Sequence, residues 1–313
     1  MLLFKPKFWD QKINLLSILF LPFSFIVLVV INLRKLLSKN LSFRIPIICI
    51  GNIYLGGTGK TPTSIFLGQQ LLKEGKNPVI IRKFYSNHKD EHDLIKSNFS
   101  NMILNKDRVK GINKAEDLNY DVAILDDGFQ DYKIKKDVNI ICFNQKQLTG
   151  NGFIFPSGPL RDSLNSLRQA DIVLINGANN KNFEKKILAI KNDLKIFYSF
   201  YRPVNLNDFT NKKLLALAGI ANPENFFHLL KENNIDVQKK LIFPDHHIFS
   251  EKTIKKIIKK ARDNNLKIIM TEKDYHKVKN YNFENWQFLK VSLEIHEREK
   301  FLKTIKDLYE KKN

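Results

Sequence analysis

The segment Cys49–Pro62, which reads C-I-G-N-I-Y-L-G-G-T-G-K-T-P, constrains the fold more than any other part of this chain. It follows a run of β-forming residues, Ile45–Ile50, and it precedes a helix-competent segment, Thr61–Glu74. A strand, a glycine-rich loop and a helix in this order are the context in which a phosphate-binding P-loop occurs. We therefore predict a P-loop between this strand and this helix.

The residue types of the loop suit the binding of a nucleoside triphosphate such as ATP. Glycines let backbone N–H groups approach phosphate oxygens closely, and the helix N-terminus adds its positive end. The strict P-loop pattern has glycine at position 54, where this chain has Tyr54. A glycine-rich turn without a ligand is the alternative, but the flanking segments favour a nucleotide. The predicted binding residues are Gly56, Gly57, Thr58, Gly59, Lys60, which reaches the β- and γ-phosphates, and Thr61, whose hydroxyl binds Mg²⁺.

The composition points to an anionic partner. The 313 residues are enough for two domains, and 52 basic against 32 acidic residues give a formal net charge of +20. The basic residues are dispersed, without an arginine-rich patch interleaved with aromatics, which disfavours nucleic acid. The two cysteines, Cys49 and Cys142, lie in apolar runs without metal-binding or disulfide spacing, which suits a reducing compartment. We expect anionic lipid or a phosphorylated substrate as the partner.

The segment Ile13–Leu33 carries no charged residue, and Arg34 and Lys35 follow it. At about 1.5 Å per residue a helix of this length just crosses a hydrocarbon core of about 30 Å. Pro22 and several polar residues make it a poor span, and a buried core helix is the alternative. With basic residues on both sides, a helix embedded in one leaflet fits better. We expect the protein on the cytoplasmic face of the inner membrane, in contact with anionic lipid.

From position 45 onward, strand-like and helix-like segments alternate, as in a mostly parallel α/β sheet flanked by helices. We predict a P-loop NTPase-type sheet, a second smaller α/β domain and an N-terminal membrane-associated helix. The expected domains are 1–36 (membrane helix), 37–205 (P-loop domain) and 206–313, whose final helix can pack on the P-loop domain. The expected strands are Ile45–Ile50, Pro78–Arg82, Asp121–Leu125, Val138–Phe143, Asp171–Ile175, Ile196–Phe200, Leu214–Ala218, Lys267–Met270 and Phe288–Leu293.

The segment Asp121–Asp127 is an apolar strand that ends in two carboxylates. In P-loop enzymes such a strand lies beside the loop, and its terminal aspartate holds Mg²⁺ directly or through water. Adjacent side chains of a strand point to opposite faces, so Asp126 and Asp127 share a task only if the chain turns there. Gly128 supplies that turn, and the amide of Gln130 can orient a phosphate or a hydroxyl. A solvated acidic turn is the alternative.

Further ionisable groups suit acid–base chemistry. The segment Ile80–Ile95 contains Asp90, which can accept the proton of a substrate hydroxyl; a solvated loop is the alternative. In F-P-D-H-H, Asp245 can fix the tautomer of His246; helix capping by Asp245 is the alternative. A metal would need a third ligand that this segment does not supply. In Thr271–Asp274, T-E-K-D, the spacing is wrong for guanine recognition.

Together these motifs resemble the tetraacyldisaccharide 4'-kinase family, the membrane-associated kinases of lipid A biosynthesis. The likeness covers nearly the whole chain. Two departures from the family pattern are Lys83-Phe84, where the family has G-Y after the arginine, and His92, where it has proline. The shared motifs, in order, are the apolar N-terminal segment, G-N-I-Y-L-G-G-T-G-K-T-P, D-E at 90–91, D-D-G-F-Q at 126–130, G-N-G with P-S-G-P-L-R at 150–161, A-G-I-A-N-P at 218–223, F-P-D-H-H and T-E-K-D.

The resemblance implies transfer of the γ-phosphate of ATP to the 4'-hydroxyl of a tetraacylated disaccharide 1-phosphate. It implies that Asp90 is the base and that His246 tunes it or relays its proton. Because neither of their two segments completes a base alone, we predict that they meet across the cleft between the two domains. Asp127 then lines the active site. The implied Mg²⁺ ligands are Thr61, Asp126 and Glu91, and the implied substrate contacts are Arg82, Gln130 and Arg161.

A membrane-associated ATPase switch of the partition type is the alternative function. It explains the variant loop and the apolar N-terminal segment. It does not explain the segments around Asp90 and His246, and it expects a second lysine where Leu55 lies.

Overall fold

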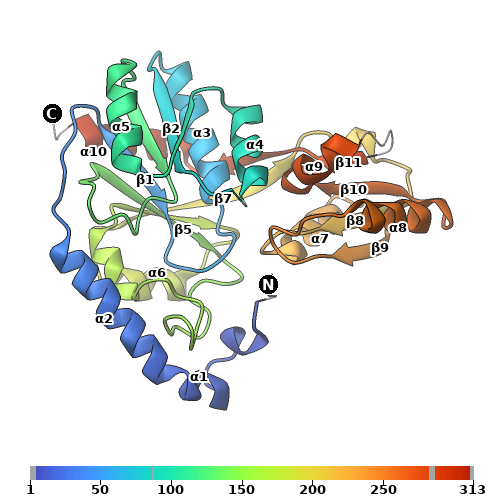
Figure 1. The fold of residues 1–313 in the computed structure, drawn as a ribbon, viewed down its shortest axis with the longest axis horizontal. Coiled ribbons are helices and arrows are strands. Elements are labelled where there is room, and N and C mark those ends of the chain that lie inside the picture. Colours follow the sequence, from blue (N-terminus) through green and yellow to red (C-terminus); the bar gives the residue numbers. More distant parts are fainter. Residues whose placement is uncertain (1–4, 87, 282–285, 311–313) are drawn as a thin grey trace. The chain divides into compact units, whose positions relative to one another are not determined.

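The computed structural model describes residues 5–86, 88–281 and 286–310, and the chain divides into two compact units (Figure 1). The larger unit contains Pro6–Phe84, Phe99–Phe200 and the C-terminal segment from Leu293. The smaller unit contains Tyr85–Asn98 and Tyr201–Ser292. Helix α4 (Lys89–Asn98) belongs to the smaller unit, which differs from the expected division at residues 205 and 206. The final helix α10 (Arg298–Glu310) belongs to the larger unit, in line with the expectation that it packs on the P-loop domain.

The larger unit is built on a sheet that, within the described residues, has the strand order β12-β7-β6-β5-β1-β4-β2-β3. All pairs from β7 through β3 in this order are parallel. The strand that precedes the P-loop, β1, is central and pairs with the acidic strand β4, as expected for a P-loop protein. The strands are β1 (Ile47–Gly51), β2 (Pro78–Lys83), β3 (Met102–Asn105), β4 (Val122–Asp126), β5 (Val138–Asn144), β6 (Ile172–Asn176), β7 (Lys195–Pro203) and β12 (Val291–Ile295).

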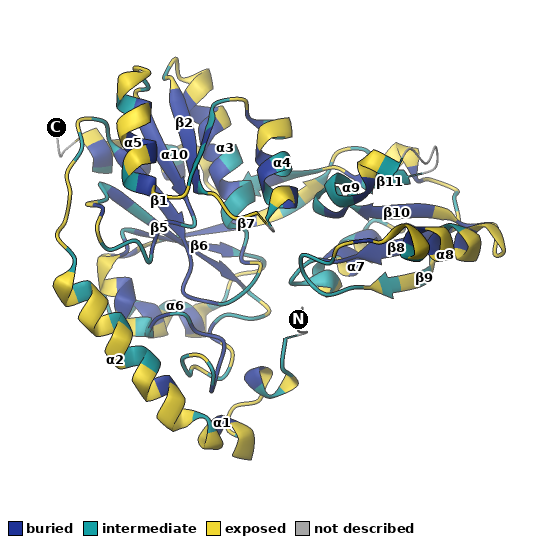
Figure 2. Ribbon diagram, viewed as in Figure 1, coloured by how far each residue is buried: buried dark blue, intermediate teal, exposed yellow. Residues whose placement is uncertain are grey.

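The central strands of this sheet, β1, β2, β4, β5 and β6, are buried along almost their whole length because helices cover the sheet. Figure 2 shows β1 and β5 in dark blue beneath helices with exposed outer faces. Phe301 of α10 contacts Phe66 and Phe197, with ring centroids 6.5 and 5.2 Å apart respectively. The continuous apolar runs of the sequence thus become strands enclosed by helices. The covering helices include α3 (Lys60–Lys73), α5 (Arg108–Asp117), α6 (Lys181–Leu188) and α10.

The smaller unit has a parallel sheet whose described strands follow the order β11-β10-β8-β9. Separate apolar clusters, one around Phe227 and Leu230 and one around Ile254 and Met270, pack against this sheet. Helix α4 packs against α9, and the Asn98 amide donates a hydrogen bond to the Glu272 carboxylate at 2.8 Å. The elements are β8 (Leu214–Ala218), α7 (Pro223–Glu232), β9 (Val237–Ile242), α8 (Glu251–Arg262), β10 (Lys267–Thr271), α9 (Glu272–Val278) and β11 (Trp286–Leu289).

One expected strand, Phe288–Leu293, is two strands in the structure. β11 ends at Leu289 in the smaller sheet, and β12 begins at Val291 in the larger sheet. Between them the carbonyl of Lys290 accepts a hydrogen bond from Val204 N–H at 3.0 Å. The apolar pattern is continuous, so it conceals the point where the chain passes from one unit to the other.

The apolar N-terminal segment forms two helices, α1 (Leu15–Leu19) and α2 (Leu21–Leu37), with Pro22 in the first turn of α2. Two of their polar side chains, Ser17 and Ser24, are buried against the rest of the larger unit. The hydroxyl of Ser24, which is buried, donates a hydrogen bond to Ile154 O at 2.7 Å. In the part of the chain that the structure describes, no helix is both long enough and apolar enough to cross a membrane.

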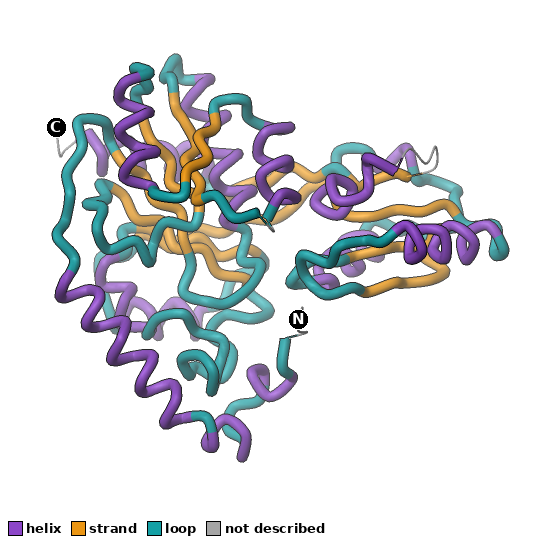
Figure 3. Tube along the Cα trace, in the orientation of Figure 1, coloured by secondary structure: helices purple, strands orange, loops and turns teal. Residues whose placement is uncertain are grey.

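Helix α2 packs against a stretch of chain without regular structure. Residues 145–163, which follow β5, form turns and isolated bridges rather than a helix or a strand (Figure 3). Asn151 in this stretch donates a hydrogen bond to the hydroxyl of Ser17 at 3.0 Å. Asp162 forms an ion pair with Lys35 at 2.8 Å. Helices α1 and α2 are therefore attached to this stretch through polar contacts. They do not form the buried core helix that was considered as an alternative.

Candidate active site

The P-loop connects β1 to α3 and has the backbone shape that its glycines permit. Gly56 and Gly59 have positive φ angles of 125° and 94°, and Gly59 directly precedes the first turn of α3. The side-chain amide of Asn52 donates hydrogen bonds to Tyr54 O at 2.7 Å and to Thr58 Oγ1 at 2.9 Å. Gly57, which lies between the two residues that Asn52 holds, is exposed. The loop is therefore held from one side and presents backbone to solvent on the other.

Tyr54, which replaces the glycine of the strict pattern, is fully buried. Its backbone forms an antiparallel bridge with Leu160, and Leu55 N–H donates to Pro159 O at 2.7 Å. The start of the loop is thus attached to the segment P-S-G-P-L-R. The departure at position 54 leaves the glycines that follow in a P-loop conformation.

Asp126, at the end of β4, is fully buried and faces the start of α3. Its carboxylate accepts hydrogen bonds from Thr61 Oγ1 at 3.1 Å and Ser64 Oγ at 3.0 Å. It also pairs with Arg82, whose Nη1 lies 3.3 Å from Thr61 Oγ1. The Thr61 hydroxyl and the Asp126 carboxylate are hard oxygen ligands of the type that Mg²⁺ binds. Their placement therefore fits a magnesium site at the P-loop.

Asp127 follows in a left-handed turn, with a φ angle of 57°. The turn brings its carboxylate to the same end of the sheet as that of Asp126, 3.6 Å from Lys60 Nζ and 2.9 Å from Arg161 Nη1. Burial raises the pKa of Asp127, but Lys60 and Arg161 outweigh burial and hold this pKa well below its ordinary value. Both carboxylates of the D-D pair therefore act on the P-loop. The chain turns as predicted, but the left-handed residue is Asp127 itself and not Gly128.

Two more side chains hold this turn. Arg108, which the sequence analysis did not single out, donates hydrogen bonds to the carbonyls of Asp126 at 3.2 Å and Asp127 at 2.7 Å. The Gln130 amide donates to Asn52 O at 2.8 Å, and its oxygen lies 3.4 Å from Arg161 Nη1. Gln130 thus joins the acidic turn to the support of the P-loop. Arg108 lies in a helix without a recognisable motif, so only the fold brings it here.

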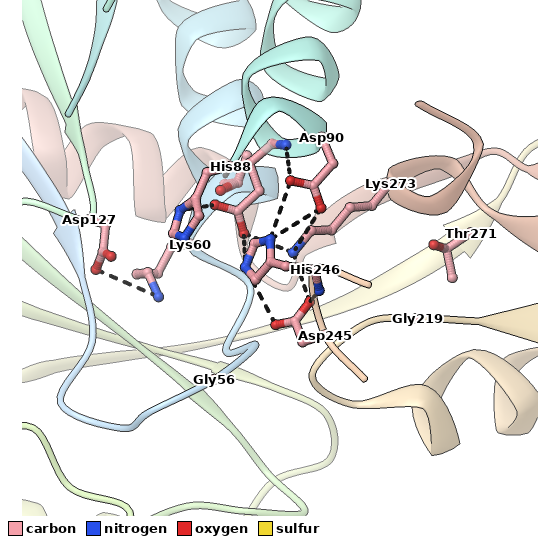
Figure 4. A network of polar contacts seen from close by, with 12 residues as sticks. Gly56, Lys60, His88, Asp90, Asp127, Gly219, Asp245, His246, Thr271 and Lys273 are labelled. Atoms are coloured by element: carbon pink, nitrogen blue, oxygen red, sulfur yellow. Dashed lines mark hydrogen bonds and ion pairs between the residues drawn. The ribbon is translucent and has the colours of Figure 1, made fainter. Parts of the chain in front are cut away.

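The smaller unit contains the second half of the candidate residues. Asp90 lies in the first turn of α4 and is buried, and both of its carboxylate oxygens lie 3.3 Å from His246 Nδ1 (Figure 4). His246 has a φ angle of 56°, a left-handed conformation that directs its ring toward α4. The two residues do meet, but within one unit, because α4 belongs to the smaller unit. The expectation that they meet across a cleft between domains was wrong in this respect.

Asp245 lies next to the His246 ring. Its carboxylate accepts a hydrogen bond from the backbone N–H of His246 at 3.0 Å and lies 3.7 Å from His246 Nε2. Asp90 faces the other ring nitrogen, Nδ1. This geometry agrees with the expectation that Asp245 lies behind an imidazole that acts on a carboxylate.

Two lysines of the T-E-K-D region form ion pairs with the carboxylates of Asp90, Glu91 and Asp245, and sequence reasoning missed both. Lys273 Nζ lies 2.9 Å from Glu91, 3.1 Å from Asp245 and 3.7 Å from Asp90. Lys277 Nζ lies 3.6 Å from Asp90. Their spacing of four residues places them on one face of α9, which is the signal that could have identified them. The motif therefore supports the Asp90 site instead of a nucleotide base.

The same lysines decide the ionisation of Asp90. Burial raises the pKa of Asp90, but the hydrogen bond from His246 and the charges of Lys273 and Lys277 lower it to about 2. Asp274, which is fully buried, holds Lys277 at 2.8 Å and accepts a hydrogen bond from Gly219 N–H at 2.8 Å. Asp90 is therefore a carboxylate at neutral pH, with a histidine and two ammonium groups around it.

The candidate residues thus form two groups. The larger unit brings together Lys60, Thr61, Arg82, Asp126, Asp127, Gln130 and Arg161, and the smaller unit brings together Asp90, Glu91 and His246. The expected magnesium ligands Thr61 and Asp126 are adjacent in the larger unit, and Glu91 lies in the smaller one.

A parallel sheet with a P-loop after its central strand, and a buried aspartate that holds the P-loop threonine, defines a P-loop nucleotide-binding protein of the α/β class. Sequence comparison makes the assignment more specific. The chain belongs to the tetraacyldisaccharide-1-P 4'-kinase (LpxK) family, whose model matches residues 16–310.

Individual relatives agree with this family. The chain is 38% identical to the tetraacyldisaccharide 4'-kinase of Pelagibacter ubique, over 98% of both chains. It is 31% identical to that of Francisella tularensis subsp. novicida, over 92% of this chain and 98% of the other. The crystal structure of LpxK from Aquifex aeolicus in complex with ATP superposes with a TM-score of 0.74 at 26% identity, over 94% of this chain and all of the other.

These comparisons confirm the resemblance and the α/β fold that the sequence predicted. They also decide between the two functional interpretations, because the full-length relatives are kinases. The partition-type ATPase switch is not favoured.

Proposed function

We propose that this chain is an ATP-dependent lipid kinase that phosphorylates the 4'-hydroxyl of tetraacyldisaccharide 1-phosphate in lipid A biosynthesis. The observation that carries the proposal is the Asp90–His246 pair, with both carboxylate oxygens 3.3 Å from the imidazole Nδ1, in a chain that also has a P-loop. A nucleotide switch needs no such pair, whereas a kinase needs a group that orients and deprotonates its hydroxyl acceptor.

The P-loop residues Gly56, Gly57, Thr58, Gly59, Lys60 and Thr61 form the proposed ATP site. Lys60 neutralises phosphate charge, and Asp127, 3.6 Å away, holds its ammonium group in place. We propose Thr61 and Asp126, which are adjacent in the larger unit, as the residues that hold Mg²⁺; Glu91, the third expected ligand, lies in the smaller unit. Bound Mg²⁺ supplies further neutralisation of the β- and γ-phosphates. Arg82, Gln130 and Arg161 are the proposed substrate contacts. Both arginines lie beside the P-loop, where each forms an ion pair with an aspartate of the D-D pair.

Asp90 accepts the hydrogen bond of the acceptor hydroxyl in this proposal. With a pKa of about 2 it is ionised and orients the hydroxyl, but it takes up a proton only late. That order suits phosphoryl transfer through a loose transition state, in which positioning and charge neutralisation dominate. The proton then resides on the Asp90–His246 pair, because His246 is within hydrogen-bond reach of the same carboxylate.

We also propose that the N-terminal helices attach the protein to the cytoplasmic face of the inner membrane. Residues Leu15, Phe25 and Leu36 are 81%, 66% and 81% exposed, while Ser17 and Ser24 are buried against the larger unit. A helix pair that buries its polar side chains and exposes its apolar ones is suited to lie in one leaflet. Basic residues beside it add roughly 1 kcal/mol each toward anionic lipid. A substrate with four acyl chains would then be reached within the bilayer.

The test is a kinase assay with the full chain in detergent. The protein is mixed with ATP, Mg²⁺ and tetraacyldisaccharide 1-phosphate, and the lipid product is identified by mass spectrometry after treatment that locates its phosphates. We expect a bisphosphorylated lipid with the new phosphate at the 4'-position. ATP hydrolysis that proceeds without lipid, together with an unmodified lipid, would overturn the proposal.

A further inference from the structure

Three side chains of the smaller unit gather atoms of the kind that bind transition metals. His88, Glu91 and His246 each offer one ligand atom, and these atoms lie within 4.8 Å of one another. The Glu91 carboxylate bridges one nitrogen of each imidazole. Its Oε2 is 3.6 Å from His88 Nδ1, and its Oε1 is 3.8 Å from His246 Nε2. Two ligands of a tetrahedral zinc ion lie about 3.4 Å apart, so small side-chain rotations suffice to bind one ion.

His246 is already oriented as a metal-binding histidine. Its Nδ1 faces the buried carboxylate of Asp90 at 3.3 Å, and its Nε2 faces Glu91. Histidines that bind metals usually donate the N–H of one ring nitrogen to a carboxylate, which fixes the tautomer and leaves the other nitrogen as the ligand. The second imidazole, His88, stacks on the first with ring centroids 4.3 Å apart, so both rings belong to one cluster (Figure 4).

The charge around the cluster favours a divalent cation. Four carboxylates face the His88–Glu91–His246 cluster or the lysines beside it, and they belong to Asp90, Glu91, Asp245 and Asp274. The ammonium groups of Lys273 and Lys277 lie among these carboxylates. Four carboxylates against two ammonium groups leave two negative charges, with both histidines neutral. A divalent ion balances these two negative charges. The ion must displace Lys273 from Glu91, and this displacement costs little free energy because Lys273 still pairs with Asp245 at 3.1 Å.

We propose that His88, Glu91 and His246 form a binding site for a divalent transition metal of the zinc class, and that the bound metal inhibits the enzyme. Two imidazoles and one carboxylate suit Zn²⁺ or Co²⁺, whereas Mg²⁺ prefers oxygen ligands and retains its water. Metal bound to Nε2 of His246 prevents the imidazole from relaying a proton for Asp90, and the same metal occupies the Glu91 carboxylate. The inhibition rests on the proposed kinase function, but the metal binding does not.

Calorimetric titration of the metal-free full chain in detergent, with Zn²⁺ and without nucleotide, tests the binding. We expect one equivalent to bind with micromolar affinity, and the affinity to fall at least tenfold in His88→Ala and in Glu91→Gln. His228→Ala is the matched control, because His228 forms an exposed pair with Glu232 at 3.1 Å in the same unit.

Co²⁺ should give the visible absorption of a four- or five-coordinate site. Circular dichroism melts show that each variant is folded, and His88→Gln repeats the test with a polar side chain.

The proposal is overturned if Zn²⁺ does not bind, if His88→Ala binds it as the wild type does, or if His228→Ala is the variant that loses binding.

The second experiment measures kinase activity at saturating Mg²⁺-ATP with increasing Zn²⁺, each variant relative to its own rate without Zn²⁺. The wild type should lose activity and recover it with a chelator, and His88→Ala should need at least tenfold more Zn²⁺. Equal inhibition of both proteins would contradict the inhibitory site. Zinc binding by a protein without any kinase activity would instead contradict the proposed function.

Discussion

Both carboxylate oxygens of Asp90 lie 3.3 Å from Nδ1 of His246, although the two residues are 156 positions apart in the sequence. Helix α4 brings Asp90 into the smaller unit, and a left-handed turn brings His246 to it. Lys273 and Lys277 offset the desolvation of the carboxylate. The pair is therefore assembled within one unit, with two ammonium groups beside its carboxylate.

The first prediction concerns the P-loop. Lys60→Ala should lower phosphoryl transfer at least a hundredfold, because phosphate charge that is not neutralised costs several kcal/mol in the transition state. Initial rates with the lipid acceptor measure this. Lys73→Ala, at the other end of the same helix, is the control and should retain activity. If Lys60→Ala stays within threefold of the wild type, the ATP site lies elsewhere.

The second prediction concerns the stability of the smaller unit. The pKa of Asp90, about 2, lies below its ordinary value of 3.8. A lowered carboxyl pKa stabilises the folded state above the ordinary pKa, and this contribution is lost as the pH falls from about 4 through about 2. The shift corresponds to about 2 kcal/mol.

Asp90→Asn removes this contribution, so its stability should depend less on pH between 5 and 2 than that of the wild type. Hydrogen exchange of amides in α4 and α9 reports the smaller unit alone. Asp117→Asn, an exposed change in the larger unit, should leave that dependence as it is. Identical pH dependence in Asp90→Asn and the wild type would disprove the effect.

The third prediction concerns Lys273. Lys273→Met removes a positive charge 3.7 Å from Asp90, so the pKa of Asp90 should rise by about one unit. A higher pKa means that a higher pH is needed to ionise the base. The acidic limb of kcat/KM against pH should therefore move to higher pH. An unshifted profile with a uniformly lower rate would mean that Lys273 acts only on folding.

Some parts of this site could be predicted from sequence because local pattern determines them. The apolar runs that form β1 and β4, and the glycines between β1 and α3, need no distant residue to be recognised. Lys273 could not be assigned, because its partners Glu91 and Asp245 come from two other segments that only the fold brings together. The burial of Ser24 could not be predicted either. An apolar helix suggests that its apolar side faces the protein, until the chain segment that covers its polar side is known.

The fourth prediction concerns membrane attachment. Phe25→Ser with Ile26→Ser changes two side chains that are 66% and 58% exposed on α2. The double variant should move from the membrane fraction toward the supernatant, because less apolar surface enters the leaflet. Sedimentation after a high-salt wash is the measurement, since salt screens the basic surface but leaves hydrophobic insertion intact. Substitution of Lys106 and Lys110, exposed lysines of the larger unit, is the control. Unchanged sedimentation of the double variant would place the anchor elsewhere.

The fifth prediction concerns the Asp90–His246 pair as a unit. Asp90→Ala should lower kcat far more than KM, because a base acts chiefly in the transition state. His246→Ala should do the same to a smaller degree, since the carboxylate remains and keeps its two lysines. Residues that act as one unit are not additive, so the double variant should be little slower than Asp90→Ala alone. Fully multiplicative losses would show that the two groups work independently. Both single variants must first bind ATP as the wild type does, because the P-loop belongs to the other unit and should not respond to either change.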